Sequence, residues 1–287
     1  MSLSSQNFIA LIIGNSRLHW GYFQGRKLLK HWDTPHLDNL VIPFWTIGAT
    51  FQITKPPFQR GVGGIPSLRE VENGITKLPS HLFPPDIPND LPIYIASVVS
   101  KQTQLWNNYP NKKIISLEEI PLTNTYSTLG IDRALCVYGA GETYGYPILV
   151  IDGGTALTYT AVGKEHNFLG GAILPGLQLQ LRTLNQNTDA LPEVSLPDRL
   201  PKLWGNETKS AIASGVIHTV ISGIDNYLTA WWEEFPEGKV ILTGGDGRLL
   251  QQLLKEKSPI SADKTLVDQT LMFQGMAKLI TNHLCKI

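Results

Sequence analysis

The chain is poor in the residues that build covalent or metal-based frameworks. Its 287 residues include two cysteines, Cys136 and Cys285, which stand too far apart to predict a disulfide framework or a zinc site. The seven histidines lack the spacing of metal ligands. We therefore expect reduced thiols, as in a cytoplasmic protein, and a chemistry that depends on neither disulfides nor zinc.

The chain also lacks a net charge and a long hydrophobic run. Lys plus Arg and Asp plus Glu both number 24, so no overall field favours nucleic acid or an anionic membrane as a partner. No apolar stretch reaches the roughly 18 residues of a membrane span, and residues 1–16 lack the basic segment of a secretory signal. We expect a soluble, cytoplasmic protein that acts on a small molecule, with neither nucleic acid nor a membrane as partner.

What the chain does have is a globular composition and an internal repetition. Apolar residues make up 42% and charged residues 17%, and the length favours two domains. Residues 8–25 and 147–163 each read as a buried strand, a small polar turn and an alternating strand. The repetition predicts two related α/β domains that face each other across a cleft, at residues 1–122 and 123–287.

Other segments can be assigned coarsely from their apolar periodicity. Further strands are expected at 27–34, 92–99, 112–117, 167–174 and at the start of 239–254. Helices are expected from about Asp132 to Tyr144, once or twice within 204–235, and at the end of 239–254. Residues 34–92 hold most of the prolines and are expected to be loop-rich around one or two short helices.

Three turns rich in glycine follow predicted strands, namely Gly14-Asn15-Ser16, Gly153-Gly154-Thr155 and the turn at Gly244-Gly245. Glycine lets a backbone approach an anion closely and point its N–H groups at it. Each turn alone is more often an ordinary tight turn. Their joint occurrence beside hydroxyl and carboxylate groups favours a role in binding phosphates.

Asp152 stands at the C-terminal end of a predicted strand, where open α/β folds present ligand-binding groups. A carboxylate beside a phosphate cradle is costly unless a cation neutralises it. The position therefore predicts that Asp152 binds a cation, with the hydroxyl of Thr155 beside it. Thr158 and Thr160 are interpreted as strand formers.

The stretch Gly130-Ile131-Asp132-Arg133 lies at a predicted helix start. Asp132 can be a helix N-cap, which is the commonest reason for an Asp at such a place. It can also accept the proton of an incoming hydroxyl during phosphoryl transfer, while Arg133 offers two parallel donors to a carboxylate or phosphate. The residues alone favour the cap, although the pair suits a kinase acceptor site.

Together these segments resemble the type III pantothenate kinases, which belong to the superfamily of acetate kinase, sugar kinases, Hsp70 and actin. The resemblance covers nearly the whole chain. Its motifs, in the order of the family, are "LGIDRA", "VIDGGTALTYT" with "GGAILPGL", "NTDALP", "GNETKSAIASG" and "LTGGDG". It implies two duplicated RNase H-like domains of the actin-like ATPase type.

The resemblance also implies an activity, the phosphorylation by ATP of the 4′-hydroxyl of pantothenate in the first step of coenzyme A synthesis. It makes Asp132 the general base and Arg133 a contact to substrate or phosphate. The implied substrate-binding residues are Tyr126, Gly130, Ile131, Asp132, Arg133 and Thr188. The implied ATP-binding residues are Gly14, Asn15, Ser16, Arg17, Gly153, Gly154, Thr155, Gly244 and Gly245. Asp152 is implied to bind a monovalent cation, K⁺ or NH₄⁺, and Mg²⁺ to accompany the nucleotide. The family further implies a homodimer in which the partner subunit completes the substrate pocket.

One motif departs from the family. The first phosphate motif usually begins with Asp, and here Ile12 stands in its place. An aliphatic side chain can hold no metal. Two consequences stay open: another group substitutes for the carboxylate, or the chain is a catalytically weakened relative that acts as a non-enzymatic accessory or regulatory protein. Another small-molecule kinase is a third alternative. Nearby, Arg17 reads as a solvated surface residue or an extra charge in the cradle, and His19 as a satisfied hairpin residue.

Overall fold

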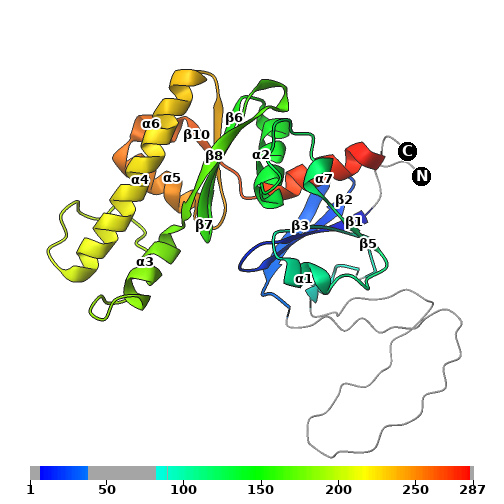
Figure 1. The fold of residues 1–287 in the computed structure, drawn as a ribbon, viewed down its shortest axis with the longest axis horizontal. Coiled ribbons are helices and arrows are strands. Elements are labelled where there is room, and N and C mark those ends of the chain that lie inside the picture. The colour runs from blue at the N-terminus through cyan, green and yellow to red at the C-terminus, as the bar shows by residue number, and fades with distance from the viewer. Residues whose placement is uncertain (1–6, 38–81, 89, 285–287) are drawn as a thin grey trace, which may run out of the picture.

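The computed structural model describes residues 7–37, 82–88 and 90–284, which form two sheets with helices around them (Figure 1). The strands are β1 (Asn7–Ile13), β2 (Leu18–Gln24), β3 (Lys27–Thr34), β4 (Ile93–Ser97), β5 (Lys112–Ile114), β6 (Ile148–Gly153), β7 (Ala156–Val162), β8 (Phe168–Pro175), β9 (Lys239–Thr243) and β10 (Thr265–Val267). The helices are α1 (Ser100–Gln104), α2 (Ile131–Tyr144), α3 (Leu177–Gln186), α4 (Thr208–Glu234), α5 (Gly247–Lys257), α6 (Pro259–Asp263) and α7 (Leu271–Leu284), with 3-10 turns η3 (Leu117–Glu119) and η4 (Lys164–His166).

The two sheets have the same topology. The first has the strand order β3-β2-β1-β4-β5, and the second has the order β8-β7-β6-β9-β10. In each sheet the first three strands are antiparallel, and the last two run parallel to the central strand, β1 or β6. The predicted α/β class and the predicted duplication of its halves are therefore confirmed.

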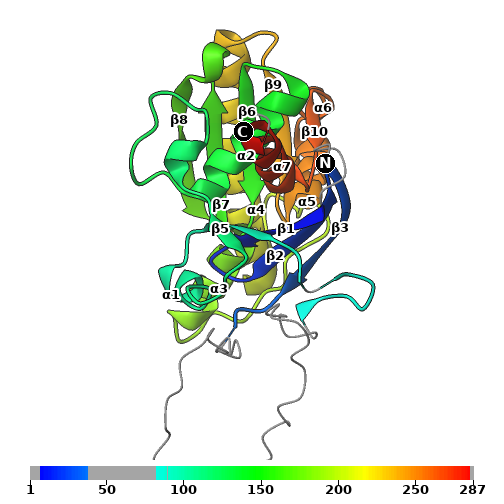
Figure 2. The same cartoon turned by 90° about the vertical axis from the view of Figure 1, so that its right-hand side faces the viewer.

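Helices α2 and α7 lie side by side between the two sheets, while α4, α5 and α6 cover the far face of the second sheet (Figures 1 and 2). The central strand β1 is buried on both faces, which explains its unbroken apolar sequence. Ala10 and Ile12 belong to the core around α2 and α7, whereas Leu11 and Ile13 belong to the core on the opposite face. Each buried Leu or Ile side chain in this strand contributes about 1.5–3 kcal/mol of hydrophobic stabilisation.

Two glycines allow α2 and α7 to pack closely. A Cβ atom on Gly139 would lie 2.6 Å from the backbone nitrogen of Gly275, so no larger residue fits at this crossing. Helix α7, near the C-terminus of the chain, also packs against β1 and β3 of the first sheet. The two sheets are thus joined through a helix pair, and α2 presents its N-terminus to the site described below.

Most elements confirm the sequence-based assignments, including the hairpin β1–β2, the helix α2 and the strand-turn-helix unit β9–α5. The segment 204–235 contains one helix, α4, of 27 residues. Periodicity did not indicate α3, β10 or α7. The expectation of one or two short helices falls mainly on residues 38–81, which lie outside the described residues. The division at residue 122 stays a prediction. None of the helices in the described ranges has the length and apolar character that crossing a bilayer requires.

Candidate active site

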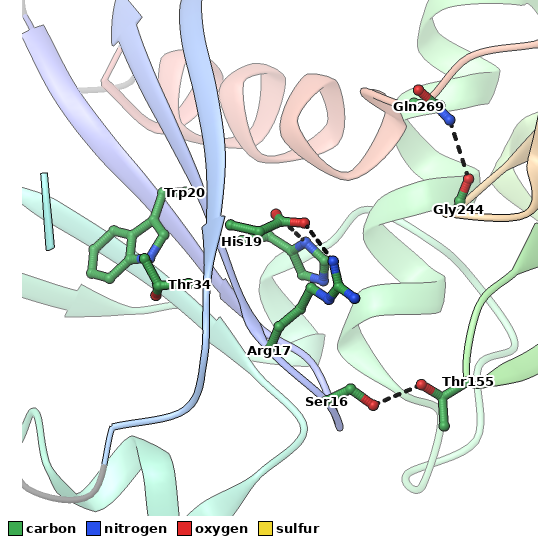
Figure 3. Close-up of polar contacts among 9 residues, drawn as sticks. Ser16, Arg17, His19, Trp20, Thr34, Thr155, Gly244 and Gln269 are labelled. Carbon is green, nitrogen blue, oxygen red and sulfur yellow. Dashed lines mark hydrogen bonds and ion pairs between the residues drawn. The ribbon is translucent and has the colours of Figure 1, made fainter. Parts of the chain in front are cut away.

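The first two glycine turns meet at a hydrogen bond between hydroxyl groups. Ser16 Oγ lies 2.7 Å from Thr155 Oγ1, although 139 residues separate them in the sequence (Figure 3). Ser16 belongs to the turn between β1 and β2, and Thr155 to the turn between β6 and β7. Two turns predicted to hold phosphates, one from each sheet, therefore lie at the same place.

The third glycine turn lies against the end of β6. Gly244 has a φ of +78°, which favours glycine, and a Cβ atom there would collide with the Asp152 carboxylate and the Gly153 carbonyl. The Asp246 N–H donates to the Gly153 carbonyl oxygen at 2.8 Å, and Gln269 Nε2 donates to the Gly244 carbonyl oxygen at 3.5 Å (Figure 3). The fold thus brings the second and third turns together around Asp152.

Asp152 is the next-to-last residue of β6, and its partly buried carboxylate receives no hydrogen bond from the described residues. Burial and the nearby Asp132 carboxylate raise the pKa of Asp152 to about 6, against the opposing effect of the His19 and Arg133 charges. An unpaired carboxylate in such surroundings is stabilised by a cation. The site of the predicted cation therefore has the electrostatic character that the prediction requires.

Asp132 lies in the first turn of α2, and it is not the N-cap. The N-cap is Gly130, which makes no side-chain cap, so the cap interpretation of Asp132 is wrong. Asp132 Oδ1 accepts a hydrogen bond from the Arg133 backbone N–H at 2.8 Å. Burial raises the pKa of Asp132, and the Arg133 hydrogen bond offsets part of that effect. A Cβ atom at position 130 would lie 2.5 Å from Asp132 Oδ1, so a side chain there would displace the carboxylate from its present position.

Arg133 is buried, and its guanidinium donates hydrogen bonds to other groups of the protein. Its Nε donates to Thr160 Oγ1 at 3.1 Å, its Nη1 to the Tyr126 hydroxyl at 3.0 Å and its Nη2 to the Tyr159 carbonyl oxygen at 2.9 Å. Thr160 is therefore an acceptor for Arg133 as well as a strand former. Arg133 brings Tyr126 to the start of α2, so two predicted substrate-binding positions are in direct contact.

Comparison with known proteins identifies the family. The family model for type III pantothenate kinase matches residues 82–230. Proteins named type III pantothenate kinase from Nostoc sp. and Synechocystis sp. are 43% and 38% identical, each over 95% of this chain and over 94% and 90% of their own length. The chain belongs to the type III pantothenate kinase family.

Solved structures agree with the fold of this family member. A Campylobacter jejuni protein named as a conserved Baf family transcriptional activator superposes with a TM-score of 0.59 at 18% identity, over 97% of this chain and all of that one. A protein from Sinorhizobium meliloti named as a 2-dehydro-3-deoxygalactonokinase gives a TM-score of 0.52 at 12% identity, over 96% of both chains. At these identities the likeness bears on the fold alone.

Two further predicted substrate-binding residues of this pantothenate kinase family member are Thr188 and Ile131. Thr188 is exposed just beyond α3, and its hydroxyl donates to the Leu184 carbonyl oxygen at 2.7 Å. Ile131 is 7% exposed and belongs to the core between the sheets. Ile131 therefore anchors the start of α2 in the core, and the contact of Thr188 with substrate stays a prediction.

The environment of His19 was not predicted from the sequence. His19 Nδ1 lies 2.8 Å from Asp33 Oδ1, and Arg17 Nη1 donates to Asp33 Oδ2 at 3.1 Å. Arg17 and His19 stand beside the turn that carries Ser16 (Figure 3). The His19 charge also influences both Asp132 and Asp152. His19 thus belongs to this site in addition to its hairpin.

The oxygen ligands available at this site fit a cation bound by a single protein carboxylate better than a metal ion coordinated by several side chains. Among the described residues no group of three or more His, Cys, Asp or Glu side chains could hold a metal ion. Ile12 is 1% exposed and offers no oxygen at the end of β1. Asp152 would hold a cation with backbone and ligand oxygens, and Mg²⁺ would be coordinated mainly by nucleotide phosphates and water, as is common for this ion.

Proposed function

We propose that this protein transfers the γ-phosphate of ATP to the 4′-hydroxyl of pantothenate and so makes 4′-phosphopantothenate, the first step of coenzyme A biosynthesis. Membership of the type III pantothenate kinase family supports the activity and the substrate. The observation that carries the proposal is the hydrogen bond of 2.7 Å between Ser16 and Thr155, because it joins the glycine turns of both sheets into one place for a triphosphate.

Asp132 is proposed as the general base. The pantothenate oxygen bonds to the γ-phosphorus as the bond to the β-phosphate bridging oxygen breaks, ADP leaves, and the hydroxyl proton passes to Asp132. A raised carboxyl pKa makes Asp132 a better proton acceptor than an exposed Asp, and strongly shifted carboxyl groups are enriched at functional sites. Arg133 and Tyr126, which are hydrogen-bonded to each other, are proposed to line the pantothenate pocket.

Nucleotide binding is assigned to the three glycine turns, where backbone N–H groups can point at phosphate oxygens. The turn residues are Gly14, Asn15, Ser16 and Arg17, then Gly153, Gly154 and Thr155, then Gly244 and Gly245. Asp152 is proposed to hold K⁺ or NH₄⁺, and Mg²⁺ is proposed to arrive with ATP and to neutralise charge on its phosphates. Since ATP is the donor, the cytoplasm is the proposed place of action.

The test is the variant Asp132→Asn, assayed for ADP formation with pantothenate, Mg²⁺ and K⁺. Loss of a general base lowers kcat by about 10²- to 10⁴-fold, while the Kd for ATP, measured by titration calorimetry, should stay within about twofold. Asp263→Asn is the matched control, because it also removes one carboxylate, from a surface ion pair with Lys255 that is 67–68% exposed. Equal losses in kcat and in ATP binding would instead assign Asp132 a structural role.

The same assay decides the alternatives. Sustained turnover of pantothenate by the wild-type chain excludes the non-enzymatic accessory role, and a panel of hydroxylated acceptors tests for another small-molecule kinase. The two relatives compared above are both named kinases. The kinase therefore stands as the function supported best.

A homodimer is proposed from an exposed face of α4. Gly215, Thr219, Gly223 and Tyr227 follow one another at four-residue spacing, and a Cβ atom on either glycine would meet no other atom within 4 Å. Helical glycines cost about 0.5–1 kcal/mol each relative to alanine, and no contact among the described residues requires glycine at these two positions. Thr219, Gly223 and Tyr227 also line a hollow beside β7 and β8. A second copy that packs its own helix here would account for both features.

A further inference from the structure

The repeated hairpins place different chemistry at equivalent positions. In the second sheet Asp152 pairs across the hairpin with Thr158, one pair before the last pair, Gly153 and Leu157. In the first sheet the equivalent pair is Ile12 and His19, followed by Ile13 and Leu18. Directly paired residues project from the same face of a sheet. In the β6–β7 hairpin the acidic residue Asp152 therefore pairs with a neutral residue. In the β1–β2 hairpin the apolar residue Ile12 pairs with a histidine.

The His19 ring is held in one orientation. Asp33 on β3 is the direct partner of His19 in the sheet, and its Oδ1 lies 2.8 Å from His19 Nδ1. Arg17 occupies the other oxygen of Asp33 at 3.1 Å. The Asp33 carboxylate thus contacts both His19 and Arg17. With Nδ1 engaged, the remaining nitrogen of the ring, Nε2, is the one available to a ligand.

His19 Nε2 points over the first glycine turn. A Cβ atom on Gly14 would lie 3.4 Å from Nε2, which is van der Waals distance, so this edge of the ring lies against the turn. The His19 side chain is 26% exposed, and Nε2 receives no hydrogen bond from the described residues. The His19 charge lowers the pKa values of Asp132 and Asp152, which burial raises.

We propose that His19 is a binding residue for the phosphate chain of the nucleotide, donating from Nε2 to a phosphate oxygen while Asp33 positions the ring through Nδ1. The inference rests on the proposed function, because it assumes that ATP occupies the glycine turns. An imidazolium donates from both nitrogens, so a ring between the Asp33 carboxylate and a phosphate oxygen has a partner at each end. His19 then supplies, at the first hairpin, a direct contact to the phosphates where Ile12 can bind no metal.

The test compares His19→Ala, His19→Gln and His19→Asn by calorimetric titration with ATP and with adenosine. The amide nitrogen of Gln extends to the position of Nε2, and that of Asn to the position of Nδ1. Loss of a hydrogen bond to a charged group predicts a rise of about 10- to 100-fold in the Kd for ATP in the Ala and Asn variants, with adenosine affinity unchanged. His19→Gln should recover at least part of the loss.

Lys30→Ala is the matched control, because it removes a cation from the neighbouring strand β3 whose partner is the exposed Asp86. The inference is overturned if His19→Ala binds ATP within about twofold of the wild type, if Asn rather than Gln restores binding, or if adenosine affinity falls equally. Should the Ala variant fail to fold, the Gln and Asn variants decide the matter. Wild-type protein that binds ATP but does not phosphorylate pantothenate contradicts the proposed function and leaves this inference standing.

Discussion

At the residue scale, the raised pKa of Asp152 leads to a stability that depends on pH. The folded-state pKa of about 6 exceeds the ordinary value of 3.8, so folding favours the protonated carboxyl group. This contribution is complete below about pH 4 and is lost as the pH rises through about 6, at an upper limit of about 2–3 kcal/mol. We predict that the free energy of unfolding of the cation-free protein falls across this window, and that Asp152→Asn abolishes the fall.

Urea unfolding in tetramethylammonium and in potassium salts of equal ionic strength measures this effect. K⁺ should restore the wild-type stability above pH 6, where the carboxylate is ionised, and should have no such effect on Asp152→Asn. Asp132, His19 and Arg133 influence the same carboxylate and are unchanged in both proteins. Identical pH profiles for wild type and Asp152→Asn would contradict the prediction.

The residues that the sequence could predict are those whose chemistry is visible within a short motif. Ser16 and Thr155 lie in glycine turns that follow strands, Asp152 directly precedes the second of these turns, and the turns do come together. His19 was missed because its partner, Asp33, depends on the register of β2 with β3. That register shifts at a bulge between Tyr22 and Phe23, which no local pattern in the sequence reveals.

At the scale of elements, hydrogen bonds to the Asp268 carboxylate connect the start of α7 with the end of α2. Its carboxylate accepts hydrogen bonds from Tyr144 at 2.8 Å, Gln274 at 2.7 Å, and both the N–H and the hydroxyl of Thr270 at 2.8 and 2.7 Å. Burial alone would raise the pKa of Asp268, but these donors outweigh it and lower the pKa. The ionised carboxylate is therefore the form that stabilises the joint between the two helices.

We predict that Asp268→Asn lowers the free energy of unfolding by about 1–3 kcal/mol at pH 7. A lowered carboxyl pKa stabilises the fold above the ordinary value of 3.8 and loses this effect as the pH falls through the folded-state value. The difference between wild type and Asp268→Asn should therefore shrink as the pH drops below 3.8. Urea unfolding at several pH values measures it, with Asp263→Asn as a surface control. A difference that persists at low pH would assign the loss to shape instead of charge.

The helix α2 could be predicted from the sequence, whereas α7 could not. Apolar spacing and the Gly145 stop delimit α2 to within one residue of its observed start. Glycine lowers the helical signal of both helices, but Gly145 and Pro147 mark the end of α2, whereas no such stop follows α7, which contains Gly275. The physical reason for that glycine is its contact with Gly139 across the helix pair, which only the tertiary structure supplies.

At the scale of the whole molecule, the repeated hairpin in the sequence was sufficient to predict two related α/β halves, whose sheets share one topology. It was insufficient to predict how the sheets are joined, because α2 and α7 come from distant parts of the chain and meet only in the folded state. The contact between Ser16 and Thr155 has the same origin. Local patterns thus define each half, and the pairing of the halves depends on packing between them.

The face of α4 that carries Gly215 and Gly223 is proposed to pack against a second copy of the chain. We predict that Gly215→Leu combined with Gly223→Leu converts a dimer to a monomer in sedimentation analysis, because leucine prevents close approach of two helices. Helix propensity rises in this variant, so the monomer should not lose thermal stability through α4 itself. Thr229→Leu, exposed on the same helix outside the stripe, should leave the dimer intact. If the double variant sediments like the wild type, this face of α4 is not the subunit interface. If pantothenate turnover falls together with the dimer while ATP binding is retained, the partner subunit contributes to the substrate pocket.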